Sequence, residues 1–180
     1  MIEIICSGIG GQGVLVAGMV LADIAMEDGK NVSWYPSYGF EMRGGAANCE
    51  VKIGDEDLQS PYCYEPDILL TMSESAIDTF EERLKPGGVL LVNSSLVDPD
   101  RTYRDDIKVI KAPVTQMAID IKNERALNVI MLGVYVGATD AVPEEVIVKG
   151  IEHKFAAKPK LIEPNVEAFR MGLKIGREQK

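Results

Sequence analysis

The chain has 180 residues, of which 46% are hydrophobic and 26% charged, and its 19 basic and 28 acidic residues leave a formal net charge of −9. This length suits one hydrophobic core, so we expect residues 1–180 to form a single α/β domain. The acidic balance argues against nucleic-acid binding, which draws its affinity from cationic contacts to phosphate.

Cysteine spacing and hydrophobicity narrow the class of protein further. Cys6, Cys49 and Cys63 lie far apart, and no C-x-x-C pair offers a zinc or iron–sulfur site. No basic segment leads into a long apolar run, and the longest apolar runs are too short or too interrupted to cross a bilayer. We therefore expect a cytoplasmic protein with reduced thiols and no membrane partner.

The first residues predict a strand, a glycine loop, a helix and a second strand. Residues 2–6 are an apolar run of strand length. Residues 14–26 are apolar on most faces, as in a helix buried between a sheet and a neighbour. Gly29 suits the left-handed position that ends such a helix, and a second strand is expected over 31–35.

Residues 48–53 have a different pattern. They read Asn-Cys-Glu-Val-Lys-Ile, so that polar and apolar side chains alternate along the chain. A period of two is typical of a strand with one buried and one solvated face. We expect a half-buried strand that is antiparallel and near an edge of the sheet.

The middle of the chain predicts parallel strands linked by a helix. Residues 67–72 are apolar and indicate a central parallel strand, and Ser73 or Ser75 can cap the helix that follows. A further buried strand is expected over 89–92, and 108–114 is another candidate.

The last third of the chain is predicted to be helical. Residues 126–139 are apolar nearly all round, Pro143 suits the first position of a helix, and Pro164 begins an amphipathic one. The whole pattern predicts a three-layer α/β/α sandwich around a Rossmann-like, mostly parallel sheet, with room for one antiparallel edge strand.

The first glycine loop is the leading candidate for a binding site. Residues 8–13 form a G-x-G-x-x-G string between a strand and a helix, where backbone N–H groups and the helix dipole favour an anion. Its candidate binding residues are Gly8, Gly10, Gly11, Gln12 and Gly13. The alternative is a tight turn that only packs the helix on the strand.

A dinucleotide site would need more than this loop. An acidic residue should end the second strand, roughly 20 residues further on, to hold the ribose hydroxyls. That strand instead ends Trp34-Tyr35-Pro36, with neither a carboxylate nor an arginine in place. The nicotinamide interpretation is therefore weakened.

A second loop, residues 36–45, reads Pro-Ser-Tyr-Gly-Phe-Glu-Met-Arg-Gly-Gly. Its arginine could meet an anionic ligand or an acidic group of a partner, or it could pair locally with Glu41. Loops after parallel strands gather at one edge of a sheet, so we expect the two loops to share a site. The added candidates are Ser37, Tyr38, Glu41, Arg43, Gly44 and Gly45. Asn128, at the start of an apolar helix, is either a cap or a polar contact at the same edge.

The two loops together resemble the γ subunit of 2-oxoacid:ferredoxin (acceptor) oxidoreductases. Further similar stretches bring the resemblance to roughly residues 1–140; they are residues 66–70, 85–88, 92–95 and 128–133. The stretch from Glu41 to Cys49 is more similar to the 2-oxoglutarate branch than to the pyruvate branch. The 2-oxoisovalerate and indolepyruvate relatives are also close.

The resemblance implies a division of labour between subunits. The family decarboxylates a 2-oxo acid on thiamine diphosphate, passes two electrons through iron–sulfur clusters to ferredoxin, and transfers the acyl group to coenzyme A. Thiamine diphosphate, Mg²⁺ and the clusters are implied to lie on sibling α and β subunits, with δ as a further candidate. This chain would complete the assembly near the acyl-transfer site, with no catalytic residue of its own. The sequence agrees, since it has no G-D-G run for thiamine diphosphate and no cysteine cluster.

Two alternative functions stay open from the sequence. One is a free-standing Rossmann-type nucleotide-binding oxidoreductase, which the missing ribose acid and catalytic base argue against. The other is a purely structural subunit whose glycine loop binds nothing. Within the favoured interpretation, the loops at residues 8–13 and 36–45 could bind a phosphate of coenzyme A or a carboxylate-bearing segment of a partner subunit.

Overall fold

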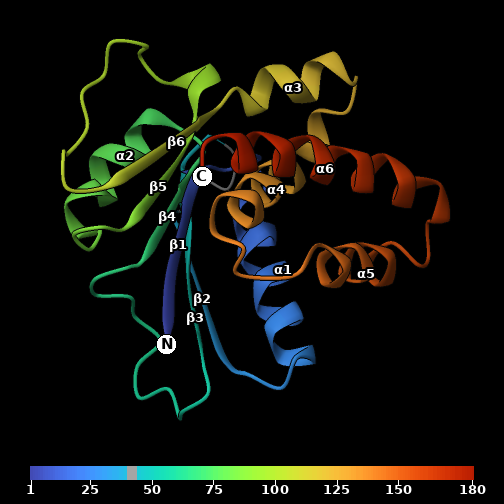
Figure 1. Cartoon of the computed structure of the whole chain (residues 1–180), viewed down its shortest axis with the longest axis horizontal. Coiled ribbons are helices and arrows are strands. Elements are labelled where there is room, and N and C mark those ends of the chain that lie inside the picture. Colours follow the sequence, from blue (N-terminus) through green and yellow to red (C-terminus); the bar gives the residue numbers. More distant parts are fainter. Residues whose placement is uncertain (40–43) are drawn as a thin grey trace.

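A six-stranded sheet forms the centre of the computed structural model, which describes residues 1–39 and 44–180 (Figure 1). The strands lie in the order β2-β3-β1-β4-β5-β6. Their bounds are β1 (Ile2–Ile9), β2 (Asn31–Tyr38), β3 (Ala46–Gly54), β4 (Ile68–Thr71), β5 (Val89–Asn93) and β6 (Lys108–Ala112). Strands β1, β4, β5 and β6 run parallel, whereas β3 is antiparallel to both of its neighbours.

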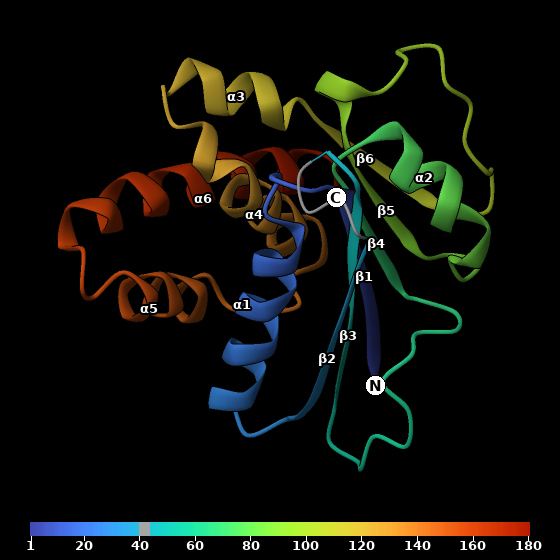
Figure 2. The same ribbon diagram turned by 180° about the vertical axis from the view of Figure 1, so that it is seen from behind.

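Helices cover both faces of this sheet, as Figures 1 and 2 show from opposite sides. Helices α1 and α4 pack on one face, with α5 and α6 outside them, and α2 packs on the other face. The helices are α1 (Val14–Glu27), α2 (Glu74–Phe80), α3 (Val114–Asp120), α4 (Leu127–Thr139), α5 (Glu144–Lys154) and α6 (Ile162–Glu178), with short 3-10 turns η1 (Glu81–Arg83), η2 (Ser94–Leu96), η3 (Glu124–Ala126) and η4 (Pro159–Leu161). The predicted three-layer, mostly parallel α/β fold is confirmed.

Most local predictions agree with these elements. Gly29 has a φ of 77° just beyond α1, and the Ser73 hydroxyl caps α2 by accepting a hydrogen bond from the Ala76 N–H. The strands predicted over 2–6 and 31–35 are each three residues longer at their carboxyl ends. Both extensions lie on the antiparallel ladders of β3, which the local hydrophobic pattern does not reveal.

The prediction for residues 48–53 is confirmed in its antiparallel pairing and its position near an edge, since β3 lies between β1 and the edge strand β2. The predicted solvated face is wrong. The polar face of β3 is also buried, since Glu50 is only 8% exposed and Lys52 only 6%. The reason is tertiary: the segment after β3 folds back over this face and brings Cys63 against it.

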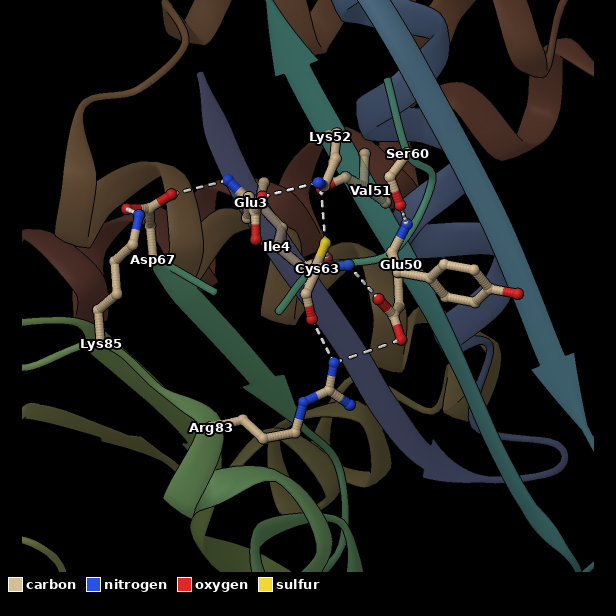
Figure 3. A network of polar contacts seen from close by, with 11 residues as sticks. Glu3, Ile4, Glu50, Val51, Lys52, Ser60, Cys63, Asp67, Arg83 and Lys85 are labelled. Carbon is tan, nitrogen blue, oxygen red and sulfur yellow. Dashed lines mark hydrogen bonds and ion pairs between the residues drawn. The ribbon is translucent and has the colours of Figure 1, made fainter. Parts of the chain in front are cut away.

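Charged groups hold that segment on the sheet (Figure 3). The Glu50 carboxylate accepts a hydrogen bond from the Cys63 N–H, and Arg83 donates to the Cys63 carbonyl while lying 3.6 Å from Glu50. Lys52 Nζ lies 2.8 Å from the Glu3 carboxylate in a nearly buried ion pair. Each buried charge therefore has an opposite charge beside it, which offsets the desolvation of both groups.

Helices α4 and α6 approach each other with almost no side chains between them. Gly133 and Gly137 on α4 face Gly172 and Gly176 on α6, and a Cβ at Gly133 would stand 2.8 Å from the Leu173 nitrogen. A Cβ at Gly172 would collide with the Ile130 carbonyl oxygen. Backbone atoms thus form this interface, because glycine alone permits so close an approach.

Candidate functional site

The first glycine loop joins β1 to α1 at the carboxyl end of the sheet. Gly13 is the residue before the first turn of α1, with a φ of 75°, and Gly11 has a φ of 107°. Residues with a side chain rarely adopt either conformation, so these two glycines are required by the turn itself. Among the described residues, neither Gly11 nor Gly13 donates its N–H to a backbone carbonyl.

The Gln12 side chain holds the loop in this shape. Its Oε1 accepts a hydrogen bond from the Ile9 N–H at 2.7 Å, and its Nε2 donates to the Met72 carbonyl at 2.9 Å. Both ends of the amide are therefore engaged within the protein. The loop presents its backbone, and not the Gln12 side chain, as the source of hydrogen-bond donors.

Asn93 supports the same edge of the sheet, a role that was not predicted from the sequence. This fully buried residue ends β5 and donates from Nδ2 to the Met72 carbonyl at 3.3 Å and to the Thr115 hydroxyl at 2.9 Å. The Met72 carbonyl is thus a shared acceptor for Gln12 and Asn93. A polar residue directly after an apolar run of strand length was the one sequence feature that could have indicated this role.

The two loops are brought together, as their pattern predicted. The Gly10 N–H donates to the Gly45 carbonyl at 2.8 Å, and the Gly44 N–H approaches the Gly10 carbonyl at 3.5 Å. Tyr38, at the end of β2, faces the same space. Glu41 and Arg43 fall outside the described residues.

A cavity of about 290 Å³ lies between the loops, and we call it the glycine-loop cavity. Its lining comes from the first glycine loop, the start of α1 and the ends of β2 and β3: Ile9, Gly10, Gly11, Gly13, Val14, Leu15, Val16, Tyr38, Ala46 and Ala47. Its walls are mainly apolar, and no carboxylate lies in the first turn of α1. The cavity thus combines apolar walls with N–H donors at a helix N-terminus, where an electronegative group is favoured.

Two other predicted site residues, Ser37 and Asn128, do not line the cavity. Ser37 alternates with Tyr38 along β2, so it lies on the opposite face of that strand and does not line the cavity. Asn128 lies in the first turn of α4, with Ala126 and not Asn128 in the cap position, and its Oδ1 accepts from the Val129 N–H at 3.0 Å. Its side chain packs beside Gly13, where a Cβ would stand 3.1 Å from Asn128 Cγ.

The cysteines are all buried, and none of them lines this cavity. Cys6 and Cys49 are direct neighbours across β1 and β3, and the interaction of the two thiols raises the pKa of Cys6 and lowers that of Cys49. Burial raises the pKa of Cys63 to about 12. The described residues contain no group of three or more His, Cys, Asp or Glu side chains placed to bind a metal.

The native thiols are expected to be inert to a water-soluble disulfide reagent at pH 8. A thiol reacts as its thiolate and must be accessible, and all three sulfurs are shielded. Titration with such a reagent should modify less than one thiol per chain in buffer and all three in denaturant. Rapid modification of a thiol in the native protein would contradict this burial.

No helix within residues 1–39 and 44–180 has both the length and the apolarity to cross a bilayer.

The fold and the glycine-loop cavity define a Rossmann-like α/β protein with a cavity at the carboxyl end of its first strand. The family model for pyruvate ferredoxin/flavodoxin oxidoreductase matches residues 3–175. The chain therefore belongs to this family. The resemblance to γ subunits of 2-oxoacid:ferredoxin oxidoreductases, and with it the expectation of an oxidoreductase subunit, is confirmed.

Relatives from two archaea are similar over nearly the whole chain. The 2-oxoglutarate synthase subunit KorC of Methanocaldococcus jannaschii is 38% identical over 179 residues, which cover 98% of this chain and 94% of the relative. The ketoisovalerate oxidoreductase subunit VorA of Methanothermobacter thermautotrophicus is 34% identical over 96% of this chain. The chain spans only 36% of the length of that second relative.

Solved structures have the same fold. The γ subunit of the keto/oxoacid ferredoxin oxidoreductase from Geobacter sulfurreducens is 33% identical, with a TM-score of 0.81 and 99% coverage of both chains. The 2-oxoglutarate:ferredoxin oxidoreductase from Magnetococcus marinus, solved with 2-oxoglutarate, coenzyme A and succinyl-CoA bound, gives a TM-score of 0.91 at 21% identity. It matches 99% of this chain with 31% of its own, and at this identity the likeness concerns the fold alone.

Proposed function

We propose that this chain is the γ subunit of a complex that oxidises a 2-oxo acid with coenzyme A and ferredoxin. A 2-oxo acid, coenzyme A and two oxidised ferredoxins give an acyl-CoA, CO₂, two reduced ferredoxins and a proton. The carbon–carboxylate bond breaks, a thioester forms, and ferredoxin takes up the electron pair. We favour 2-oxoglutarate as the substrate, because the KorC relative is a 2-oxoglutarate synthase subunit and covers nearly the whole chain.

The glycine-loop cavity is the observation that carries the role of this chain. Its apolar walls suit the uncharged arm of coenzyme A, and the N–H groups of Gly11 and Gly13 suit an oxygen of that ligand. Tyr38 adds a flat surface at its rim, and Arg43 would add a cation. The chain's residues thus bind and orient the acyl acceptor; we assign them no proton transfer.

The remaining chemistry belongs to sibling subunits in this proposal. Thiamine diphosphate with Mg²⁺ supplies decarboxylation and iron–sulfur clusters supply electron transfer to ferredoxin. The described residues hold no cluster of candidate metal ligands, and the three cysteines are buried and do not line the cavity. We place these groups on α and β subunits, with a δ subunit as a further candidate, and derive no step through them.

The test uses the complex purified from its native host through a tag on this chain. Chains that bind thiamine diphosphate and iron–sulfur clusters should co-purify. Tyr38→Ala and Arg43→Ala should each raise the KM for coenzyme A about tenfold, equivalent to about 1.4 kcal/mol. The decarboxylation half-reaction, followed as CO₂ release without coenzyme A, should be unchanged, because both residues are proposed to act on coenzyme A and not on the 2-oxo acid.

Tyr62→Ala is the matched control for this test. Tyr62 is also an exposed tyrosine, but it packs against Tyr35 and does not line the cavity. The proposal is wrong if the KM for coenzyme A is the same in all three variants and the wild type. Purification of the chain alone would instead favour a free-standing protein.

A further inference from the structure

The carbonyl of Met72 connects the first glycine loop to the end of β5. Met72 follows the last residue of β4, and among the described residues its carbonyl accepts two hydrogen bonds, both from side-chain amides. One donor is Gln12 Nε2 at 2.9 Å, and the other is Asn93 Nδ2 at 3.3 Å. Because β1, β4 and β5 are neighbours in the sheet, this acceptor links the ends of three parallel strands (Figure 1).

The Asn93 amide is held by further hydrogen bonds. The residue is fully buried, its Nδ2 also donates to the Thr115 hydroxyl at 2.9 Å, and its Oδ1 accepts from the Thr115 N–H at 3.2 Å. Both protons of the amide nitrogen and the amide oxygen therefore have partners. Rotation of this buried amide would leave a polar group unpaired, which is costly. Asn93 thus presents its donor to the Met72 carbonyl in one fixed direction.

The Gln12 side chain is confined in the same way at the other end of this connection. It lies over Gly8, where an added Cβ would stand 2.5 Å from Gln12 Oε1. Its Oε1 accepts from the Ile9 N–H, and the Gln12 N–H donates to the Ile9 carbonyl at 3.1 Å. Residues 9 and 12 are thus linked twice, and the bond to Met72 anchors this turn to the sheet. Gln12 stands between two glycines of the loop, so its anchorage restricts the orientation of the N–H groups on both sides.

We propose that Asn93 is a positioning residue for the glycine-loop cavity, acting through the Met72 carbonyl and the Gln12 amide. Two donors on one carbonyl oxygen use both of its lone pairs and fix its direction. Without Asn93 the carbonyl would turn more freely, and the N–H groups of the loop would take several orientations instead of one. A ligand must then select the competent orientation, which weakens its binding in proportion to the population of that orientation. This role of Asn93 rests on the proposed function, in which the loop binds coenzyme A.

The KM for coenzyme A and the kcat of the purified complex test this role. Gln12→Met keeps the length of the side chain but loses both of its hydrogen bonds, and it should raise the KM about tenfold while kcat at saturating coenzyme A changes less than about twofold. Asn93→Ala should raise the KM about threefold, because Gln12 still contacts Met72 and the loop keeps its competent orientation about a third of the time. The double variant should have the KM of Gln12→Met alone, because Asn93 acts only through Gln12.

Thr71→Val is the matched control for Asn93→Ala. Thr71 is fully buried beside Met72, and its hydroxyl donates to the Leu91 carbonyl at 2.8 Å, so this variant also loses a buried hydrogen bond between β4 and β5. Both variants should lower the melting temperature of the complex, but Thr71→Val should leave the KM for coenzyme A unchanged. An equal rise of the KM in Thr71→Val would trace the effect to lost stability and overturn the proposal. Asn93→Ser replaces Asn93→Ala in these measurements if the alanine variant yields no assembled complex.

Amide hydrogen exchange of the loop provides a measurement that does not depend on coenzyme A. Exchange over residues 10–13 should be faster in Asn93→Ala than in Thr71→Val, because only the first variant releases the Met72 carbonyl.

The outcomes separate the role of Asn93 from the proposed function. If Tyr38→Ala raises the KM for coenzyme A but Asn93→Ala leaves either the KM or the loop exchange as in the wild type, Asn93 is not a positioning residue although the proposed function stands. A double variant whose KM rises by the product of the two single effects would also overturn the proposal, because Asn93 would then act independently of Gln12. If Asn93→Ala speeds loop exchange but no variant, Tyr38→Ala and Arg43→Ala included, changes the KM, Asn93 positions the loop and the proposed binding of coenzyme A fails.

Discussion

Gly172→Ala is expected to lower the free energy of unfolding by about 3 kcal/mol or more. In this chain the added methyl group would meet the Ile130 carbonyl, a backbone atom of α4 that cannot move without shifting the helix. Helix propensity acts in the opposite direction, since alanine is favoured over glycine by about 1 kcal/mol inside a helix. Any loss of stability in this variant would therefore come from the contact between α4 and α6. Thermal unfolding should show a melting temperature lower by roughly 6–12 °C for a chain of this size.

Gly150→Ala is the matched control for this prediction. Gly150 is also within a helix, but a Cβ there would meet only the end of the Ile24 side chain, at 3.0 Å from Cγ1. That side chain can rotate, so we expect a change within about 1 kcal/mol in either direction. Equal stability of Gly172→Ala and the wild type would mean that α4 and α6 do not approach each other this closely.

Lys52→Met is expected to destabilise the fold by about 3–5 kcal/mol, because it leaves a buried carboxylate without its partner. Lys52 Nζ lies 2.8 Å from Glu3, and the two side chains are 8% and 15% exposed. The loss should appear in denaturant unfolding as a lower midpoint with an unchanged slope. The double variant Glu3→Leu/Lys52→Met should recover most of the loss, because neither charge is then buried.

An exposed pair provides the comparison for this prediction. Lys30 lies 2.6 Å from Asp55, but the side chains are 37% and 80% exposed. Lys30→Met should therefore cost less than about 1 kcal/mol. If Lys52→Met were no more destabilising than Lys30→Met, solvent would have to reach Glu3, and the segment around Cys63 could not cover β3.

Variants that destabilise the fold and variants that test coenzyme A binding should affect the complex in different ways. The segment around Cys63 and the α4–α6 contact do not line the glycine-loop cavity. The segment packs on β1 and β3, however, and α4 packs on α1, and β1, β3 and α1 contribute residues to the cavity. A destabilised variant should lose assembled complex before it changes the KM for coenzyme A. The variants Tyr38→Ala and Arg43→Ala, which test the proposed function, should do the reverse.

The sequence by itself determined the features that depend on neighbouring residues. The left-handed Gly29, the Ser73 cap and the alternation over 48–53 all follow from local backbone and side-chain chemistry. The two glycine motifs, in their order along the chain, also indicated the family. None of these features depends on which strands pair with each other in the sheet.

Only the tertiary structure decided the features that join distant residues. It placed β3 between β1 and β2, buried Lys52 beside Glu3, and brought α4 and α6 together at their glycines. It engaged both ends of the Gln12 amide, one of them at the distant Met72, and it placed Arg125 and Lys154 around one hollow. Strand order, helix contacts and the sharing of a cavity depend on how separate segments pack, and the hydrophobic period of each segment is compatible with several such arrangements.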